Sequence, residues 1–544
     1  MDNIIIQETA MTQDYDLIIH NGTVVDGSGR PSVQADVAVS RGLIAQIGDL
    51  SRSSSVTRID AAGLVVAPGF IDLHSHTDLF LPALPTADSL VCQGITTVVT
   101  GQCGLSPAPL GTGNCRRTRE LFGARLNRIG EIMPWPLCSH LGKYLDFLTQ
   151  ICLSVNVVPL VGQGVIRGAV MGGNPGSPDD SQRALMRHLA EEAMDEGAFG
   201  ISTGLIYPPG SWSTTQELVD IVSCVAARGG MYFSHIRNEG EKLLESIREA
   251  LEIGRLSGAR VHISHFKAAG KCNCDKSVRA LELLDKAAET QPLGMDMYPY
   301  TAGSTSLVSL LPDWALQGNR SDLFMRLKDP KQRRKMTSDM ATGGLAQGNW
   351  EGVLIIQSES RPEYAGYRLS DLAAQSGLTP EEWLYDALLA THCDPMMVLF
   401  MMSEDNRRNE ICHPLMAIGT DGFGLATAGL TSGIMTHPRS FGTFPRILGR
   451  YCREEKLISL ETAVYKMTGL AASYLNLKDR GIIREASVAD LTIFNPKTVI
   501  DTATYDCPKS YPKGIDTVLV AGQVVVSQGE HTGARPGKVI RRNG

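Results

Sequence analysis

The sequence predicts an α/β protein: a (β/α)8 TIM barrel with a small β-sandwich built from both termini and a lid insertion between strands 7 and 8. Three observations support this fold. Strand-like and helix-like stretches alternate through the middle of the chain, which is typical of parallel βα units. An all-β segment lies at each end, and each is too small to form a core alone. A long stretch separates the last two strands, too long for a βα loop.

The two terminal segments are expected to form the sandwich together. Residues 1–14 are a polar tail, and residues 15–66 contain short apolar strands. Asn21-Gly22 follows the first of these strands and favours a hairpin. Residues 476–544 contain further strands, at Asp490–Phe494 and within Thr517–Val526. Pairing the two segments would give each the apolar partner that it lacks.

The barrel is expected over residues 67–475. The gap between its last two strands carries a strand signal of its own, Val353–Ile356, and predicts a lid insertion over about residues 302–410. The eight predicted barrel strands are Phe70–His74, Ile95–Thr100, Val155–Val161, Ala198–Thr203, Met231–His235, Arg260–His265, Leu293–Tyr298 and Leu415–Thr420.

Composition excludes several classes of partner. The 544 residues carry a net charge of -7 without a basic run, so we expect no nucleic acid. Apolar runs stay short of a bilayer span, so we expect no membrane. The 12 cysteines show no disulfide framework and the start lacks a signal-peptide core, which indicates a cytoplasmic protein. A homo-oligomer is left open.

Residues of metal-ligand type stand at the ends of five predicted strands. The C-terminal ends of barrel strands meet at one face, and residues i and i+2 of a strand share a side. Each residue alone has an ordinary explanation, such as a core histidine, a buried cysteine or an Asp-Gly turn. We keep that explanation for His262. Together the others favour a one- or two-zinc hydrolase site: His74, His76, Cys103, His235, His265 and Asp421.

The chain also carries longer motif strings, and with them it resembles the amidohydrolase superfamily and, within it, the D-aminoacylase (N-acyl-D-amino-acid deacylase) family. The resemblance runs from about Tyr15 to the C-terminal strands. The strings are Ala67–Asp78, Gly101–Gly104, Gly204–Gly210, Ser264–Lys267, Tyr298–Thr305, Gly419–Gly422, His437–Arg439 and Gly442–Arg446.

The resemblance implies hydrolysis of N-acyl-D-amino acids to a carboxylate and a free D-amino acid. It implies one tight Zn²⁺ on Cys103, His235 and His265. A second, weaker metal position would be lined by His74, His76 and Asp421, with Cys103 able to bridge. Asp421 would be the catalytic proton shuttle and Tyr207 would lie over the reacting carbonyl. Lys267, Tyr300 and Ser304 would contact the substrate carboxylate.

Some positions depart from the family pattern. Gln163 stands where a histidine is expected, and Phe441 where a tyrosine is expected.

No lysine lies between Lys143 and Lys242, so predicted strands three and four cannot supply a carbamylated bridging lysine. Two alternatives remain: a cyclic-amide hydrolase of hydantoinase or dihydroorotase type, and a non-catalytic assembly protein of the same fold.

Overall fold

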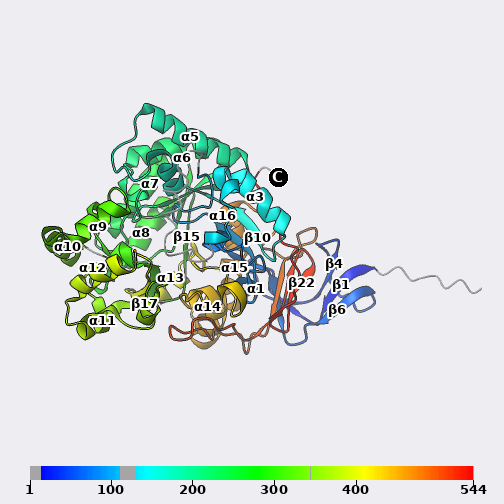
Figure 1. Cartoon of the computed structure of the whole chain (residues 1–544). Coiled ribbons are helices and arrows are strands. Elements are labelled where there is room, and N and C mark those ends of the chain that lie inside the picture. Colours follow the sequence, from blue (N-terminus) through cyan, green and yellow to red (C-terminus); the bar gives the residue numbers. More distant parts are fainter. Residues whose placement is uncertain (1–13, 111–129, 344, 543–544) are drawn as a thin grey trace, which may run out of the picture.

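Parallel strands form the centre of the computed structural model, which describes residues 14–110, 130–343 and 345–542 (Figure 1). One sheet has the order β10-β9-β8 and a second the order β11-β12-β13-β14-β15-β19. Only Leu160 separates β10 from β11, and Leu73 N donates to Ile418 O between β8 and β19 (3.4 Å). This order of parallel strands is typical of a TIM barrel. The strands are β8 (Phe70–Asp72), β9 (Ile95–Thr100), β10 (Asn156–Pro159), β11 (Val161–Gly162), β12 (Gly200–Gly204), β13 (Met231–His235), β14 (Arg260–Ile263), β15 (Leu293–Met297) and β19 (Met416–Ile418).

All eight predicted strand positions are present, and the third is broken at Leu160 into β10 and β11. Every residue of β9, β12 and β13 is buried, as expected for parallel strands covered on both faces. The outer helices begin at local signals: Asp179 and Gln182 form a capping box at the start of α5. The helices around the barrel are α1 (Asp88–Val91), α3 (Leu141–Ile151), α4 (Gln163–Met171), α5 (Asp180–Asp195), α6 (Thr215–Ala227), α7 (Leu243–Ser257), α8 (Lys276–Ala288), α13 (Glu404–Cys412), α14 (Arg439–Arg446), α15 (Leu460–Met467) and α16 (Gly469–Leu475).

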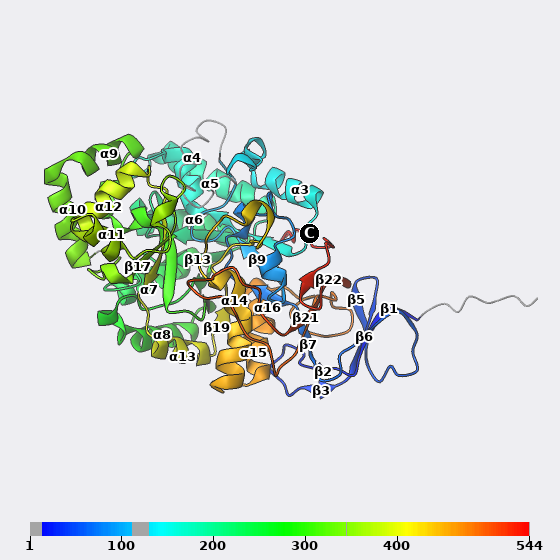
Figure 2. The ribbon, with the colours of Figure 1, turned by 60° about the horizontal axis from the view of Figure 1, so that its bottom comes forward.

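Two further sheets combine both ends of the chain at one end of the molecule (Figure 2). Their orders are β5-β4-β1-β6 and β23-β22-β21-β20-β7-β2-β3, and β7 of the N-terminal segment pairs antiparallel with β20 of the C-terminal segment. Ile19, Val39 and Leu491 belong to one core between the sheets. The strands are β1 (Tyr15–His20), β2 (Thr23–Val24), β3 (Val33–Gln34), β4 (Asp36–Ser40), β5 (Leu43–Gly48), β6 (Ser55–Asp60), β7 (Val65–Pro68), β20 (Leu491–Phe494), β21 (Ile515–Val520), β22 (Gln523–Ser527) and β23 (Glu530–His531).

The hairpin predicted at Asn21-Gly22 is wrong. β1 pairs with β4 and β6, whereas β2 pairs with β3 and β7 in the other sheet. Asn21 has φ 62°, and the turn carries the chain from one sheet to the other. The same left-handed conformation that closes a two-residue hairpin thus serves here as a crossover between sheets.

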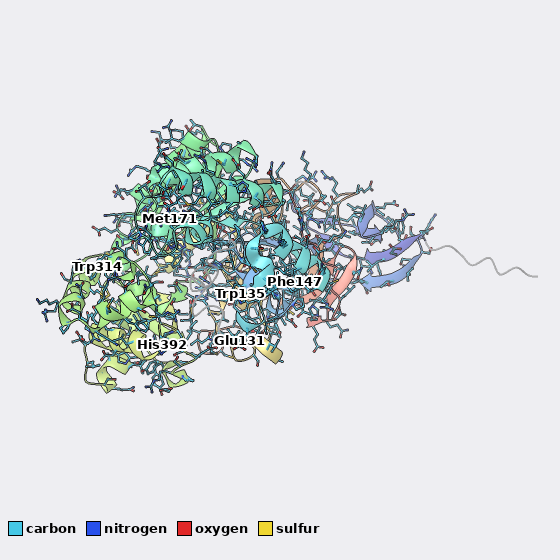
Figure 3. The ribbon with its side chains drawn as sticks, turned by 45° about the horizontal axis from the view of Figure 1, so that its top comes forward. Glu131, Trp135, Phe147, Met171, Trp314 and His392 are labelled. Carbon is cyan, nitrogen blue, oxygen red and sulfur yellow. The ribbon has the colours of Figure 1, made fainter. Side chains whose placement is uncertain are left out.

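The segment between β15 and α13 forms a separate unit at the other end of the molecule (Figures 1 and 2). It has an antiparallel sheet of order β16-β18-β17 and its own apolar core. Figure 3 labels Trp314 and His392 on this unit, and Phe147 of α3 on the barrel. None of the described helices is long and apolar enough to cross a membrane. The elements are β16 (Ala302–Ser306), α9 (Arg320–Lys328), α10 (Pro330–Gly343), β17 (Val353–Gln357), α11 (Leu369–Gln375), α12 (Pro380–Ala390) and β18 (Met396–Phe400).

Candidate metal centre and active site

The six predicted ligand residues meet at the C-terminal ends of the barrel strands. They follow or end β8, β9, β13, β14 and β19, which places them on one face. All six are buried: His74, His76, Cys103, His235, His265 and Asp421.

Cys103 lies at the centre of this group. Its Sγ is 3.3 Å from His74 Nε2, 3.5 Å from His235 Nδ1 and 3.4 Å from His265 Nε2. Burial alone would raise the pKa of the thiol, but the charges of His74 and His265 hold it well below its ordinary value. The thiolate, which is the metal-binding form, is therefore favoured.

Asp421 forms the other side of the group. Its Oδ1 is 3.2 Å from His76 Nε2 and 3.6 Å from His74 Nε2, and its Oδ2 is 2.8 Å from Arg439. Although Asp421 is buried, the neighbouring Arg439 and His265 hold the pKa of its carboxyl well below its ordinary value. Asp421 is thus an ionised carboxylate, available as a ligand or a proton acceptor.

Glu239 is a site residue that the sequence analysis missed. Its carboxylate accepts from Lys267 Nζ (2.6 Å) and lies 3.1 Å from His265 Nδ1 and 3.8 Å from His235 Nε2. Glu239 follows the end of β13 and stands four residues after His235. This short distance in sequence from a predicted ligand was the signal that could have identified it. Lys267 Nζ is also 2.7 Å from His265 Nδ1, so the lysine and the carboxylate together hold this imidazole.

Asp296, at position four of β15, is a second missed residue and supports the ligands from behind. Its Oδ1 accepts from His265 N (2.9 Å), and its Oδ2 lies 2.8 Å from His262 Nε2 and 3.5 Å from His74 Nδ1. All of these groups are buried. His262 therefore has a carboxylate partner inside the barrel, in agreement with its interpretation as a core histidine.

The residues present suit zinc. Zn–S and Zn–N bonds of about 2.3 and 2.05 Å at a tetrahedral angle separate sulfur and nitrogen by about 3.6 Å. The distances from Cys103 to the three imidazoles lie close to that value.

A pocket of about 580 Å³, which includes its part open to solvent, leads to these ligands. Tyr207, Lys267 and Ser304 line it. Tyr207 packs edge-on against His235, with ring centroids 5.2 Å apart, and its hydroxyl is 3.2 Å from Thr305 Oγ1. Arg439, which the sequence analysis named only within a motif string, also lines the pocket.

Tyr300 is not among the described residues that line the pocket, and its contact with the substrate stays a prediction. Its hydroxyl donates to Asp501 (3.5 Å) and its ring lies under Arg446, outside the described lining of the pocket. Tyr298, two residues earlier, lines the pocket instead, and Arg439 lies over its ring.

Neither of the two residues that depart from the family pattern, Gln163 and Phe441, belongs to the described lining of the pocket. Gln163 donates to Ser213 Oγ (2.8 Å) below the loop that carries Tyr207. Phe441 is fully buried beside Tyr511, with ring centroids 5.5 Å apart.

Comparisons with known proteins agree with this geometry. Residues 419–526 match the Amidohydrolase family. The chain is 38% identical to an N-acyl-D-aspartate deacylase of Alcaligenes xylosoxydans xylosoxydans over 96% of its own length and 95% of that protein. A crystal structure of D-aminoacylase matches with a TM-score of 0.82 and 35% identity, covering 97% of this chain and all of the other. The N-acyl-D-glutamate deacylase of Bordetella bronchiseptica, solved with zinc and a phosphonate mimic of the tetrahedral intermediate, matches with a TM-score of 0.81 and 33% identity, covering 97% and 99%.

These similarities span almost the whole chain. The protein belongs to the D-aminoacylase family of amidohydrolases.

Proposed function

We propose that the protein hydrolyses N-acyl-D-amino acids to a carboxylate and a free D-amino acid, with zinc as its metal. One observation carries this proposal: a buried thiol and three imidazoles within 3.5 Å of it lie beside a pocket that also contains two cations, Lys267 and Arg439. Thiolate and imidazole suit zinc, and the cations suit a substrate with a free carboxylate. The zinc-containing structure of the Bordetella relative supports the same assignment.

Cys103, His235 and His265 would hold a tight zinc, and His74, His76 and Asp421 a weaker second position that shares Cys103. Zinc bound there supplies a Lewis acid for the amide carbonyl and a water of lowered pKa. Cys103 would take the place that a carbamylated lysine occupies in many binuclear amidohydrolases, because no lysine lies between Lys143 and Lys242.

Asp421 would accept a proton from the attacking water and return it to the leaving amine. Its ion pair with Arg439 keeps the carboxylate ionised, and the hydroxyl of Tyr207 lies in the same pocket, where it can donate to the developing oxyanion. Lys267, Tyr300 and Ser304 would hold the substrate carboxylate, and Tyr298, which lines the same pocket, would assist them.

We also propose the remaining organisation. Residues 15–66 and 476–544 would form the β-sandwich, residues 67–475 the barrel, and the insertion of about residues 302–410 a lid. The insertion supplies Leu345, Leu399 and Met401 to the pocket, which supports a role as its cover. A cytoplasmic location agrees with the described cysteines, all of which are free thiols.

A panel of N-acyl amino acids in both enantiomers tests the function, with zinc per chain measured on the same preparation. We expect hydrolysis of D-enantiomers alone and at least one zinc per chain. Hydrolysis of hydantoins or dihydroorotate in place of acyl amino acids would favour the cyclic-amide alternative. A metal-free protein inactive on every substrate would favour the assembly protein.

A further inference from the structure

The loop between β12 and α6 carries Tyr207 and is fastened at its far end by side chains from two other elements. Tyr207 rests on His235, and Leu205 N donates to His235 O (3.0 Å) at the start of the loop. Backbone bonds within the loop include Ser211 N to Tyr207 O (2.9 Å), Trp212 N to Pro209 O (3.3 Å) and Ser213 N to Gly210 O (3.1 Å). The Tyr207 hydroxyl lies 3.2 Å from Thr305 Oγ1 at its tip, and the backbone that carries the ring is held through residues 211–213.

Arg237 provides one anchor. Its Nη1 donates to Ser211 O (2.8 Å) and its Nη2 to Ser213 O (3.0 Å). The other edge of the guanidinium is fixed by Glu249, through Nε and Nη2 (2.9 Å each). A planar fork that joins two carbonyls to one carboxylate holds the loop in one orientation, which a lysine could not do. Arg237 follows the predicted zinc ligand His235 by two residues, so the same strand end positions both.

Gln163 provides the second anchor. It donates to Ser213 Oγ (2.8 Å), and Ser213 in turn donates to Glu217 (2.9 Å), which accepts from Arg167 (3.0 Å). All four side chains are buried. The loop also packs closely here, because a Cβ at Gly210 would lie 3.4 Å from Gln163 Oε1 and 3.0 Å from Gly204 O.

We infer that Arg237, assisted by Gln163, is a positioning residue that aims the Tyr207 hydroxyl at the reacting carbonyl. The inference rests on the proposed function for the role of Tyr207. A donor to an oxyanion works only when it is held in place before the reaction, and small displacements are costly. Arg237 touches neither pocket nor ligands through its guanidinium contacts, so its effect on the reaction must pass through the loop.

A double-mutant cycle tests this inference. Loss of one oxyanion donor typically costs about 10²–10³ in kcat. We expect Tyr207→Phe to show a loss of that order. Arg237→Met should lower kcat by at least about tenfold, with zinc per chain unchanged. In the Tyr207→Phe background, Arg237→Met should cost less than about twofold, because the donor that it positions is already gone. Arg237→Lys should behave like Arg237→Met. Independent, multiplicative losses would overturn the inference.

Hydrogen–deuterium exchange gives a readout that needs no substrate. Peptides covering residues 205–213 should exchange faster in Arg237→Met and Gln163→Ala than in the unmodified protein. Arg228→Met, which breaks only ion pairs with Asp195 and Glu191, should leave them unchanged. Unchanged exchange in all three variants would overturn the inference. If the unmodified protein hydrolyses no N-acyl-D-amino acid but the exchange result holds, the proposed function fails and the anchoring of the loop stands.

Discussion

Three of the proposed ligands have a backbone conformation that L-amino acids rarely adopt. Cys103 has φ 54°, His265 has φ 34° and Asp421 has φ 49°. Such residues cost about 1–3 kcal/mol each and persist where surrounding contacts enforce them. One such contact links two proposed ligands, since Asp421 N donates to His74 O (2.7 Å), and another links a ligand to its supporting carboxylate, since His265 N donates to Asp296 (2.9 Å). The left-handed conformation thus lowers the stability of the fold but turns the three side chains toward the proposed metal site.

The proton-shuttle role of Asp421 is tested by Asp421→Asn. The amide keeps the shape of the carboxylate but cannot accept the proton, so turnover should fall by about 10² or more. Most of the tight zinc should remain, because its proposed ligands are elsewhere. Steady-state rates and zinc content are measured together, with the exposed Asp405→Asn as control. Near-normal turnover with zinc intact would contradict the assignment.

The bridging role of Cys103 is tested against Cys92, another buried cysteine. Burial raises the pKa of Cys92 to about 12, so this thiol stays protonated at neutral pH. Cys103→Ala should lose the tight zinc and essentially all activity, whereas Cys92→Ala should lose neither. Activity of the unmodified enzyme should not respond to bicarbonate, because no carbamate has to form. Atomic absorption measures the zinc, and full zinc with a normal rate in Cys103→Ala would refute the site.

At the scale of the elements, the paired strands β16 and β18 of the insertion form an apolar wall of the pocket. Gly303 pairs with Leu399, and a Cβ at Gly303 would lie 2.7 Å from Met401 Cε and 3.4 Å from Tyr298 Oη. The glycine leaves room beside Ser304, which is proposed to hold the substrate carboxylate. In the substrate, the α-carbon carries both the carboxylate and the side chain. With the carboxylate at Ser304, the substrate side chain would face Leu399 and Met401.

Gly303→Ala should therefore discriminate by substrate size. Met401 would shift into the pocket, and misfit of a single methylene in an apolar pocket costs about 1–3 kcal/mol. We expect kcat/KM for N-acetyl-D-phenylalanine to fall at least about tenfold, while N-acetyl-D-alanine is little affected. Gly433→Ala, at a position with no neighbour within 4 Å of the added carbon, serves as control. Equal losses on both substrates would show that Gly303 does not border the side-chain pocket.

At the scale of the whole molecule, the C-terminal segment closes the face of the barrel opposite the site. Val157 N donates to Lys538 O (2.9 Å), Ile540 N to Val157 O (2.8 Å) and Arg542 N to Gly197 O (3.1 Å). The approach is close, because a Cβ at Gly537 would lie 2.2 Å from Val155 O. Figure 1 shows this end of the chain beside α3, on the barrel, although β22 lies in the sheet near the N-terminus.

Removal of residues 534–544 should destabilise the protein without altering its chemistry. With the bond from Gly537 N to Leu153 O (2.7 Å), four backbone hydrogen bonds join this segment to the barrel. A net hydrogen bond contributes about 0.5–1.5 kcal/mol, so we expect a loss of roughly 2–6 kcal/mol in the free energy of unfolding. Urea unfolding measures the loss, and zinc content and kcat of the folded enzyme should be unchanged. Asp146→Ala, which removes only the exposed ion pair with Arg541, should cost under about 1 kcal/mol. A large loss of kcat on truncation would show that the two barrel faces are coupled.

The sequence by itself determined the barrel strands and the six residues gathered at their ends. Both are local properties: apolar periodicity marks a strand, and a histidine or cysteine at its end is visible without knowledge of its neighbours. Local sequence signals were less reliable for turns, because the same left-handed backbone conformation can close a hairpin or carry the chain from one sheet to another. The left-handed Asn21 predicted a hairpin and instead joins two sheets.

Only the tertiary structure decided which other groups reach the site. Glu239, Asp296 and Arg439 gain their meaning from contacts with residues distant in sequence, such as Lys267, His262 and Asp421. Tyr298 and Tyr300 stand two residues apart, so on a regular strand their side chains would point to the same face. The sequence pattern therefore could not tell which of them faces the pocket. Beyond the end of β15 the alternation no longer holds, and the fold turns Tyr298 to the pocket and Tyr300 to Asp501.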